Sequence, residues 1–201
     1  MNPVKNLTGL ILAGGRAQRM GGIDKGLIPF KDMPLIEAAI MRIKPQVEHI
    51  LINANRNLEQ YAQYGYPVLP DDEQNFSGPL AGFLVGLKHC STPYLLTTPC
   101  DSPLLPLDLA DKMMAELQRD QFDLVYASSK EANQKIWAQP VFCLMRCELV
   151  GSLESFLKAG DLKIDHWFKK INASTVVFDD TIAFANVNTP EELQSLEKLS
   201  I

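Results

Sequence analysis

The segment from Leu10 to Lys25 constrains the fold of this chain more than any other part of the sequence. It begins with the short apolar run Leu10–Ala13, which is typical of a strand buried on both faces. The run ends at Gly14 and Gly15, after which basic residues and further glycines follow. Glycine lets the backbone approach a ligand closely, and successive N–H groups in such a loop form a concave anion site. The segment therefore predicts a buried strand followed by a loop that binds a polyphosphate.

Two common phosphate-binding motifs are absent from this segment. The Walker pattern requires Gly-Lys followed by Ser or Thr, whereas Lys25 lies between Asp24 and Gly26. The dinucleotide pattern Gly-x-Gly-x-x-Gly has no match in any register of the loop. The segment is therefore either a flexible surface loop with scattered charge or a phosphate loop of another type.

The length and charge of the chain limit its possible functions. Its 201 residues suffice for one domain with a hydrophobic core, so we expect a single domain over residues 1–201. The net charge of -5 argues against nucleic acid or an anionic membrane as a partner, because both need a basic surface. A local anion site remains compatible with this charge, since four basic residues accompany the single acid Asp24 between residues 14 and 31: Arg16, Arg19, Lys25 and Lys31.

The apolar stretches and the cysteines indicate a cytoplasmic protein. No stretch reaches the length of a membrane span, and the run Leu10–Ala13 is too short for the apolar region of a secretory signal. The four cysteines lack the spacing of a disulfide framework, which favours a reducing compartment. Cys143, Cys147 and His166 are conceivable metal ligands, but the cysteines are better interpreted as small buried residues because no close second pair is present.

Apolar runs alternate with helix-like segments, which predicts an α/β sandwich with a mainly parallel sheet. We expect strands at 7–13, 47–53, 68–69, 94–98, 123–127, 137–145 and 174–178, the sixth interrupted near its start by Gln139-Pro140. Helices are expected after Pro34, at 58–64, from Pro79, and over 110–117, 149–157 and 163–169. A last helix has Thr189 as its N-cap, Pro190 at its first position and Glu192 three residues after the cap, the pattern of a capping box.

Polar residues follow the first four predicted strands directly. In open parallel sheets, ligands lie over the carboxyl ends of the strands near the point where the strand order reverses. The expected loops therefore bring residues from four separate segments to one edge: Gly14 with Gly15, Asn53, Asp71 and Asp101.

Three charged residues are the candidates for catalysis. Asp101, between Pro99 and Pro103, suits a Mg²⁺ ligand near a triphosphate, although it could equally belong to an Asx turn or a helix cap. Lys25 suits neutralisation of phosphate charge; alternatively it is solvated or paired with Asp24. Arg19 could hold a phosphate through two hydrogen bonds, or form a surface ion pair.

The neighbouring polar and glycine residues suit recognition of a nucleoside. Asn53 and Asp71 can contact hydroxyl groups, amides or base edges, although each alone is a common turn residue. The segment from Gly78 to Gly82 could underlie a purine, or it could serve only close packing of a helix.

These motifs together resemble the molybdenum cofactor guanylyltransferases over nearly the whole chain. The resemblance rests on Leu-Ala-Gly-Gly and Arg-Met-Gly-Gly-x-Asp-Lys-Gly within 12–26, Asn-Ala-Asn at 53–55, Asp-Asp at 71–72, Gly-Pro-Leu-Ala-Gly at 78–82, Pro-Cys-Asp-x-Pro at 99–103 and Asn-Val-Asn-Thr-Pro-Glu-Glu-Leu at 186–193. It implies a three-layer sandwich with a Rossmann-like nucleotidyltransferase sheet, whose N-terminal half binds GTP and Mg²⁺ and whose C-terminal half binds a pterin.

The resemblance also implies an activity, substrates and site residues. The reaction would transfer GMP from GTP to the phosphate of Mo-molybdopterin and release pyrophosphate. GTP contacts are implied for Leu12, Ala13, Gly14, Lys25, Asn53, Asp71 and Asp101, with Asp101 also holding Mg²⁺; Asn186 and Asn188 would help to seat the pterin. A monomer with transient contacts to other molybdenum cofactor biosynthesis proteins is expected.

Two other functions remain open from the sequence. A related enzyme would transfer CMP to the same pterin, or would act on a sugar or alcohol phosphate. A non-catalytic module would only bind the nucleotide, although the joint presence of Asp101 and Lys25 argues against it.

Overall fold

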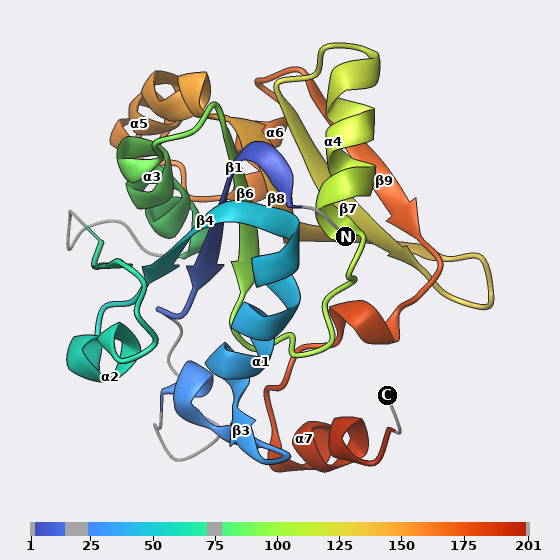
Figure 1. The fold of residues 1–201 in the computed structure, drawn as a ribbon. Coiled ribbons are helices and arrows are strands. Elements are labelled where there is room, and N and C mark those ends of the chain that lie inside the picture. The colour runs from blue at the N-terminus through green and yellow to red at the C-terminus, as the bar shows by residue number, and fades with distance from the viewer. Residues whose placement is uncertain (1–2, 15–23, 72–77, 200–201) are drawn as a thin grey trace.

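The computed structural model describes residues 3–14, 24–71 and 78–199, and a seven-stranded sheet runs through its centre (Figure 1). Every neighbouring pair of strands is parallel except the two pairs that involve β8, which runs antiparallel to β6 and to β7. The predicted mainly parallel α/β sheet is therefore confirmed. In sheet order the strands are β5 (Val68–Leu69), β4 (Val47–Asn53), β1 (Val4–Leu12), β6 (Tyr94–Pro99), β8 (Ile136–Arg146), β7 (Leu124–Lys130) and β9 (Ala173–Phe178).

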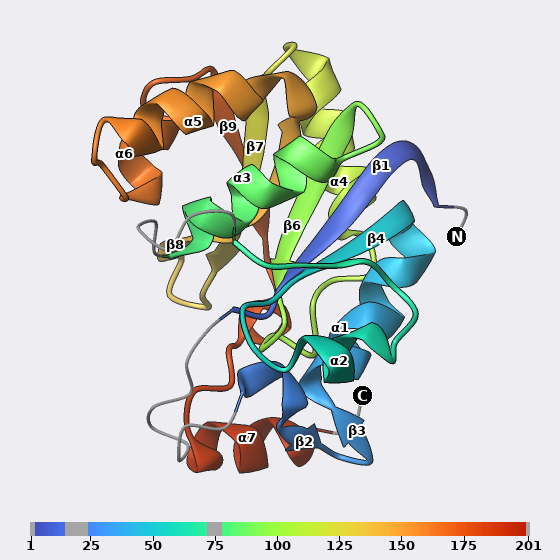
Figure 2. The same ribbon diagram turned by 90° about the vertical axis from the view of Figure 1, so that its left-hand side faces the viewer.

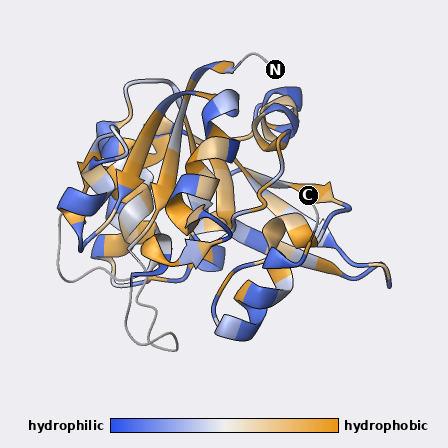
Figure 3. Cartoon of the chain, turned by 60° about the horizontal axis from the view of Figure 1, so that its bottom comes forward, coloured by the Kyte–Doolittle hydropathy of each residue, from blue (hydrophilic) through white to orange (hydrophobic). Residues whose placement is uncertain are grey.

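Helices cover both faces of the sheet, which confirms the three layers (Figures 1 and 2). Because successive side chains of a strand point to opposite faces, Leu10 and Ile11 of β1 belong to different hydrophobic clusters. The cluster with Ile11 includes residues of α1 (Leu35–Ile43) and α4 (Leu109–Arg119). The cluster with Leu10 includes residues of α3 (Pro79–His89), α5 (Val150–Lys158) and α6 (Ile164–Phe168). Figure 3 shows the apolar residues of the strands between these helices.

The start of α1 differs by one residue from the prediction. Pro34 does not open the helix as its first residue but caps it, with an extended backbone (φ -65°, ψ 152°), and α1 begins at Leu35. The reason is that Pro34 is also the last residue of β3 (Met33–Pro34), which pairs with β2 (Pro29–Phe30) in a small hairpin. A residue that belongs to a strand cannot also have helical angles.

The chain ends in α7 (Pro190–Glu197), and its predicted capping box is present. The hydroxyl of Thr189 accepts a hydrogen bond from the Glu192 N–H at 3.2 Å, and Glu192 accepts one from the Thr189 N–H at 3.1 Å. A third hydrophobic cluster packs Leu196 and Val187 with Phe30 of the hairpin. Figures 1 and 2 accordingly show α7 beside β2 and β3, so the end of the chain returns to its beginning.

Short helical turns connect the larger elements. They are η2 (Lys25–Leu27), η3 (Lys44–Gln46), α2 (Leu58–Ala62), η4 (Cys147–Leu149) and η5 (Ile182–Phe184). Within the described ranges, the helices are too short or too polar for any of them to span a lipid bilayer.

The predicted interruption of β8 is a bulge. Tyr126 of β7 pairs with Cys143, but the next residue, Ala127, pairs with Gln139, so residues 140–142 have no partner on β7. Proline has no N–H to donate to a ladder, which explains why the bulge begins at Pro140. The carbonyl of Val141 instead accepts a hydrogen bond from the Thr97 hydroxyl of β6 at 2.6 Å. The bulge turns the start of β8 toward the loop that follows β6.

The carboxyl ends of β1, β4, β5 and β6 meet at one edge of the sheet. Backbone hydrogen bonds continue the ladders beyond the strand ends, from Ala13 N to Asn53 O at 2.8 Å and from Cys100 N to Leu12 O at 3.0 Å. After β1 the chain builds outward through β4 and β5 and then returns to the other side of β1 as β6. The strand order thus reverses between β1 and β6, which is where open α/β sheets bind their ligands.

Candidate active site

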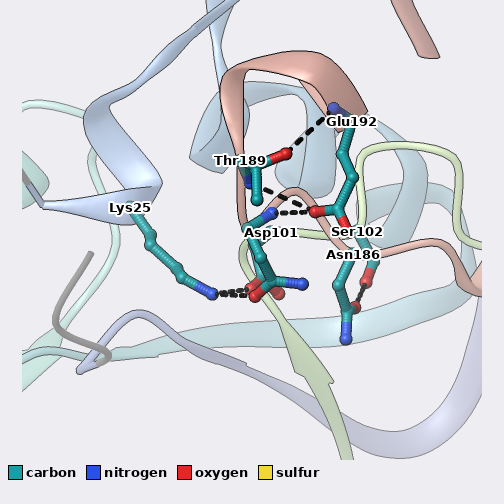
Figure 4. Close-up of polar contacts among 7 residues, drawn as sticks. Lys25, Asp101, Ser102, Asn186, Thr189 and Glu192 are labelled. Carbon is teal, nitrogen blue, oxygen red and sulfur yellow. Dashed lines mark hydrogen bonds and ion pairs between the residues drawn. The ribbon is translucent and has the colours of Figure 1, made fainter. Parts of the chain in front are cut away.

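Lys25 and Asp101 meet at this reversal point. The Lys25 ammonium donates hydrogen bonds to Asp101 Oδ2 at 2.8 Å and to Asn188 Oδ1 at 2.6 Å (Figure 4). The Lys25 side chain is 18% exposed and the Asp101 side chain 11%. Three segments far apart in the sequence therefore contribute to one largely buried contact, and the pairing of Lys25 with Asp101 was not predicted from the sequence.

The Asp101 loop is held from both sides. The Asp101 carbonyl accepts a hydrogen bond from the Val187 N–H at 2.9 Å, which ties the loop to the segment before α7. On the other side, the Arg42 Nε donates to the Leu105 carbonyl at 2.7 Å, and Gln46 Nε2 donates to the Pro106 carbonyl at 2.9 Å. These hydrogen bonds hold the loop that carries the Asp101 carboxylate in place. They could not be predicted from the sequence, because Arg42 in α1 and Gln46 in η3 lie far from Asp101 along the chain.

Lys25 is positioned through its neighbour Asp24. The Tyr61 hydroxyl donates to Asp24 Oδ1 at 2.5 Å, and Asn57 Nδ2 donates to Oδ2 at 3.2 Å. Burial and the contact with Asp24 raise the pKa of Tyr61, so its hydroxyl stays protonated as a donor. Asp24 therefore pairs with Tyr61 and Asn57, and the alternative that it pairs with Lys25 is wrong. These bonds anchor the end of the glycine loop, and the Lys25 side chain extends to Asp101 instead.

Asn53 and Asp71 lie together, as the sequence predicted. Asn53 Nδ2 donates to Asp71 Oδ1 at 2.9 Å and to the Leu69 carbonyl at 3.0 Å. Asn55 Nδ2 donates to the other carboxylate oxygen of Asp71 at 2.7 Å. The three side chains form a hydrogen-bonded set at the carboxyl ends of β4 and β5, and Asn55, noted in the sequence as part of the Asn-Ala-Asn motif, is its third member.

The two glycines near the start of α3 meet different structural needs. A Cβ on Gly82 would lie 2.5 Å from Asn53 Oδ1 and 2.5 Å from Leu12 Cδ2, so Gly82 allows α3 to pack directly on β1 and β4. Gly78 caps α3 with φ +88°, a conformation that favours glycine. Of the two alternatives for this segment, close helix packing accounts for Gly82; a contact with a purine stays a prediction.

The other predicted site residues of the glycine loop are only partly described. Ala13 is buried beside Asn53, and Gly14 is exposed, with Asn55 Nδ2 3.3 Å from where its Cβ would be. Gly15 and Arg19 lie within residues 15–23, outside the described part of the chain.

A cleft opens beside the Lys25–Asp101 contact. One part of about 310 Å³ is lined by both of these residues and by the bulge residues Pro140, Val141 and Phe142. An adjoining part of about 570 Å³ reaches α7 and includes Phe184 and Leu196. Gln139, Asn186 and Asn188 line both parts. In the sequence the bulge is visible as the interruption at Gln139-Pro140, and the structure shows that it forms a wall of the cleft.

The donor set suits a magnesium ion that is bound with a substrate. Mg²⁺ in such sites takes one or two protein carboxylates and completes its coordination with phosphate oxygens and water. Asp101, at the strand reversal point, fits this need. Across residues 3–14, 24–71 and 78–199, no group of three or more His, Cys, Asp or Glu could hold a metal by itself. Cys143 lies in the core, and His166 instead contacts Asp161 at 2.9 Å.

The sequence matches a known family over most of its length. The family described as MobA-like NTP transferase domain matches residues 9–175. The molybdenum cofactor guanylyltransferase of Polynucleobacter asymbioticus is 70% identical over 193 residues, which cover 96% of either chain. That of Bordetella petrii is 50% identical over 191 residues, covering 95% of this chain and 97% of the relative.

A solved structure shares the fold. The molybdopterin-guanine dinucleotide biosynthesis protein A of Archaeoglobus fulgidus superposes with a TM-score of 0.78 and 20% sequence identity, over 94% of this chain and 96% of that one. At this identity the likeness concerns the fold alone.

Proposed function

The chain belongs to the molybdenum cofactor guanylyltransferase family of the MobA-like NTP transferases, and on that premise we propose how its residues perform the transfer. The reaction moves GMP from GTP to the terminal phosphate of Mo-molybdopterin, forms molybdopterin guanine dinucleotide and releases pyrophosphate. The observation that carries the proposal is the contact of Lys25 with Asp101 at the strand reversal point, beside an open cleft.

The nucleotide lies over the carboxyl ends of β1, β4 and β5 in this proposal. Backbone groups of the loop that begins at Leu12 surround the triphosphate, and Asn53 with Asp71 contacts the nucleoside. The mutual hydrogen bonds of Asn53, Asn55 and Asp71 support this role, because a preorganised set loses little entropy on binding. The loop residues concerned are Leu12, Ala13, Gly14 and Gly15, with Gly78 and Gly82 at the adjoining start of α3.

Lys25, Arg19 and Asp101 supply the electrostatics. Asp101 would hold Mg²⁺, which neutralises triphosphate charge when it is bound. Lys25 faces the same point and is proposed to stabilise charge that develops on the phosphates, with Arg19 clamping them. The acceptor phosphate is already an anion, so its oxygen can attack the α-phosphorus in line without a strong general base. Positioning and charge neutralisation then account for the catalysis.

The acceptor occupies the cleft between the β8 bulge and α7. Asn186 and Asn188 line both of its parts and are proposed to seat the acceptor. Lys25, Asp101 and Asn188 come from one chain, which supports a monomer as the active form. All four cysteines are free, which agrees with action in the reducing cytoplasm, where the enzyme would meet other cofactor biosynthesis proteins.

The test is pyrophosphate release from each nucleoside triphosphate in the presence of Mg²⁺ and Mo-molybdopterin. We expect release with GTP, and little with CTP, ATP or UTP. A preference for CTP would overturn the guanine assignment. Nucleotide binding without pyrophosphate release would indicate a binding module, and loss of release on chelation of the metal would support the role of Mg²⁺.

A further inference from the structure

The segment Asn186–Asn188 presents two amides to the cleft, and the residues on either side of it, Ala185 and Thr189, have extended backbone angles. Val187 between them is fully buried in the cluster that holds α7. Because side chains alternate along an extended backbone, burial of Val187 directs its two neighbours to the opposite side. Both asparagines line both parts of the cleft. The alternation therefore makes them a pair of ligand-facing groups with a fixed backbone.

The orientation of the Asn188 amide follows from its partner. Its Oδ1 accepts a hydrogen bond from the Lys25 ammonium at 2.6 Å. An ammonium has only donors, so the amide atom that faces it must be the oxygen. The NH₂ group of Asn188 is therefore directed away from Lys25 and remains a donor.

The Asn186 amide is oriented by Ser102. The Ser102 hydroxyl donates to Asn186 Oδ1 at 2.5 Å, and Ser102 is completely buried. Figure 4 shows the Asn186 oxygen turned to Ser102 and the nitrogen turned away from it. The second amide thus also keeps its NH₂ group for a ligand.

Two of the backbone donors of this segment are already used. The Val187 N–H donates to the Asp101 carbonyl at 2.9 Å, and the Asn188 N–H donates to Glu192 Oε2 at 2.7 Å. Each of the two amide oxygens is also engaged by a protein donor, so the NH₂ groups are what these two side chains present to a ligand. These donors lie next to the Lys25 ammonium, so they suit the oxygens of an anion better than a ring edge that carries its own N–H groups.

We propose that Ser102 is a positioning residue of the acceptor site, which turns the Asn186 amide so that its NH₂ group, with that of Asn188, binds the phosphate oxygens of the acceptor. This inference rests on the proposed function, since it names the contacts of the attacking phosphate in the same cleft. It assigns a role to the residue after Asp101, whose side chain faces Asn186 and not the open cleft.

The experiment compares three variants by steady-state kinetics with GTP and Mo-molybdopterin. Ser102→Ala removes the hydroxyl, and we expect the KM for Mo-molybdopterin to rise about three- to tenfold while the KM for GTP stays unchanged. Ser102→Thr keeps a hydroxyl and serves as the matched control, with both KM values expected within about twofold of the wild type. Asn186→Asp still accepts the Ser102 hydrogen bond but places an anionic oxygen toward the ligand, so its acceptor KM should rise at least about thirtyfold.

A binding measurement separates phosphate from ring contacts. Dephosphorylated molybdopterin should bind the wild type and Ser102→Ala with equal affinity, whereas molybdopterin should bind the variant more weakly. Equal weakening of both compounds would overturn the phosphate assignment. An unchanged acceptor KM in Ser102→Ala, or an acceptor KM in Asn186→Asp equal to that of the wild type, would overturn the positioning role. Wild-type protein that releases no pyrophosphate would instead contradict the proposed function itself.

Discussion

The two ends of the central sheet use polar residues in different ways. At the carboxyl ends of β1 and β6, charged side chains contact each other, as in the pair of Lys25 with Asp101. At the opposite end, hydroxyl and thiol groups contact nearby backbone: Thr92 Oγ1 donates to the Tyr94 carbonyl at 2.9 Å, and Cys90 Sγ to the Thr92 carbonyl at 3.2 Å. Removing two charges from water costs as much as their attraction returns, so the first arrangement adds little stability. The comparison separates the end of the sheet where we propose that the chemistry takes place from the end where polar groups stabilise the fold.

Asp101→Asn should give the largest effect at the chemical end. The amide can still accept from Lys25, so the melting temperature should stay close to that of the wild type. Loss of the carboxylate removes the proposed Mg²⁺ ligand, and we expect turnover to fall about 1,000-fold, measured by pyrophosphate release. Turnover like that of the wild type would exclude Asp101 as the metal ligand and weaken the contrast between the two ends.

Lys25→Met should lower turnover by about 100-fold, because it removes the cation that we propose to stabilise charge on the phosphates. It also leaves the largely buried Asp101 without its ammonium partner, so some loss of thermal stability is expected. The matched control is Lys158→Met on α5, since Lys158 is 62% exposed and forms only a surface ion pair with Glu154. If both variants lost activity equally, the effect of Lys25→Met would not come from the site.

Gly82→Ala tests packing next to the site. The added Cβ would clash with Asn53 and Leu12, so we expect a loss of about 1–3 kcal/mol in the free energy of unfolding. Because Asn53 must shift, GTP affinity should fall about tenfold, measured by calorimetry with Mg²⁺. Gly151→Ala is the control: Gly151 lies in α5 with open space around its Cβ position, and the change should add up to about 1 kcal/mol of stability. A Gly82→Ala protein as stable as the wild type would show that α3 can shift without cost.

Cys90→Ser should have the smallest effect on turnover, within about twofold, because Cys90 lies at the end of the sheet that serves the fold. A hydrogen bond with Cys147 lowers the pKa of Cys90 below that of an ordinary thiol. Alkylation of Cys90 by iodoacetamide should therefore be faster at pH 7 than alkylation of an ordinary thiol, and it should slow as the pH is lowered. A rate that still rises steeply from pH 7 to pH 9 would contradict this, as would loss of turnover on labelling.

Much of the fold was predictable because it depends on local patterns. The strands of the seven-stranded sheet lie within a few residues of their predicted positions and the capping box at Thr189 is present, whereas the β2–β3 hairpin was not predicted. The antiparallel direction of β8 was not predicted, because a buried apolar strand has the same residue pattern whether it runs parallel or antiparallel to its neighbours. The bulge was visible only as a proline in a strand; its place in the wall of the cleft depends on the contact of Val141 with Thr97.

The residues of the candidate site also fall into two groups, those that the sequence indicated and those that it did not. Its glycine loop, Lys25 and Asp101 were singled out by spacing and residue chemistry, and their roles remain predictions that the experiments above test. The supporting residues Tyr61, Arg42 and Ser102 were missed, since a tyrosine, a helical arginine or a serine in a turn carries no local signal of its partner.

The sequence alone determined the order of the seven main strands and the helices between them, the glycine loop after the first strand and the family of the chain, because each depends on residue patterns within short segments. Only the tertiary structure decided which polar groups meet. Lys25 and Asn188 are 163 positions apart, and they touch because Val187 and Leu196 bury their side chains against the β2–β3 hairpin and bring the end of the chain back to its start. Such a contact is set by packing of distant apolar side chains, which no spacing of residues along the chain encodes.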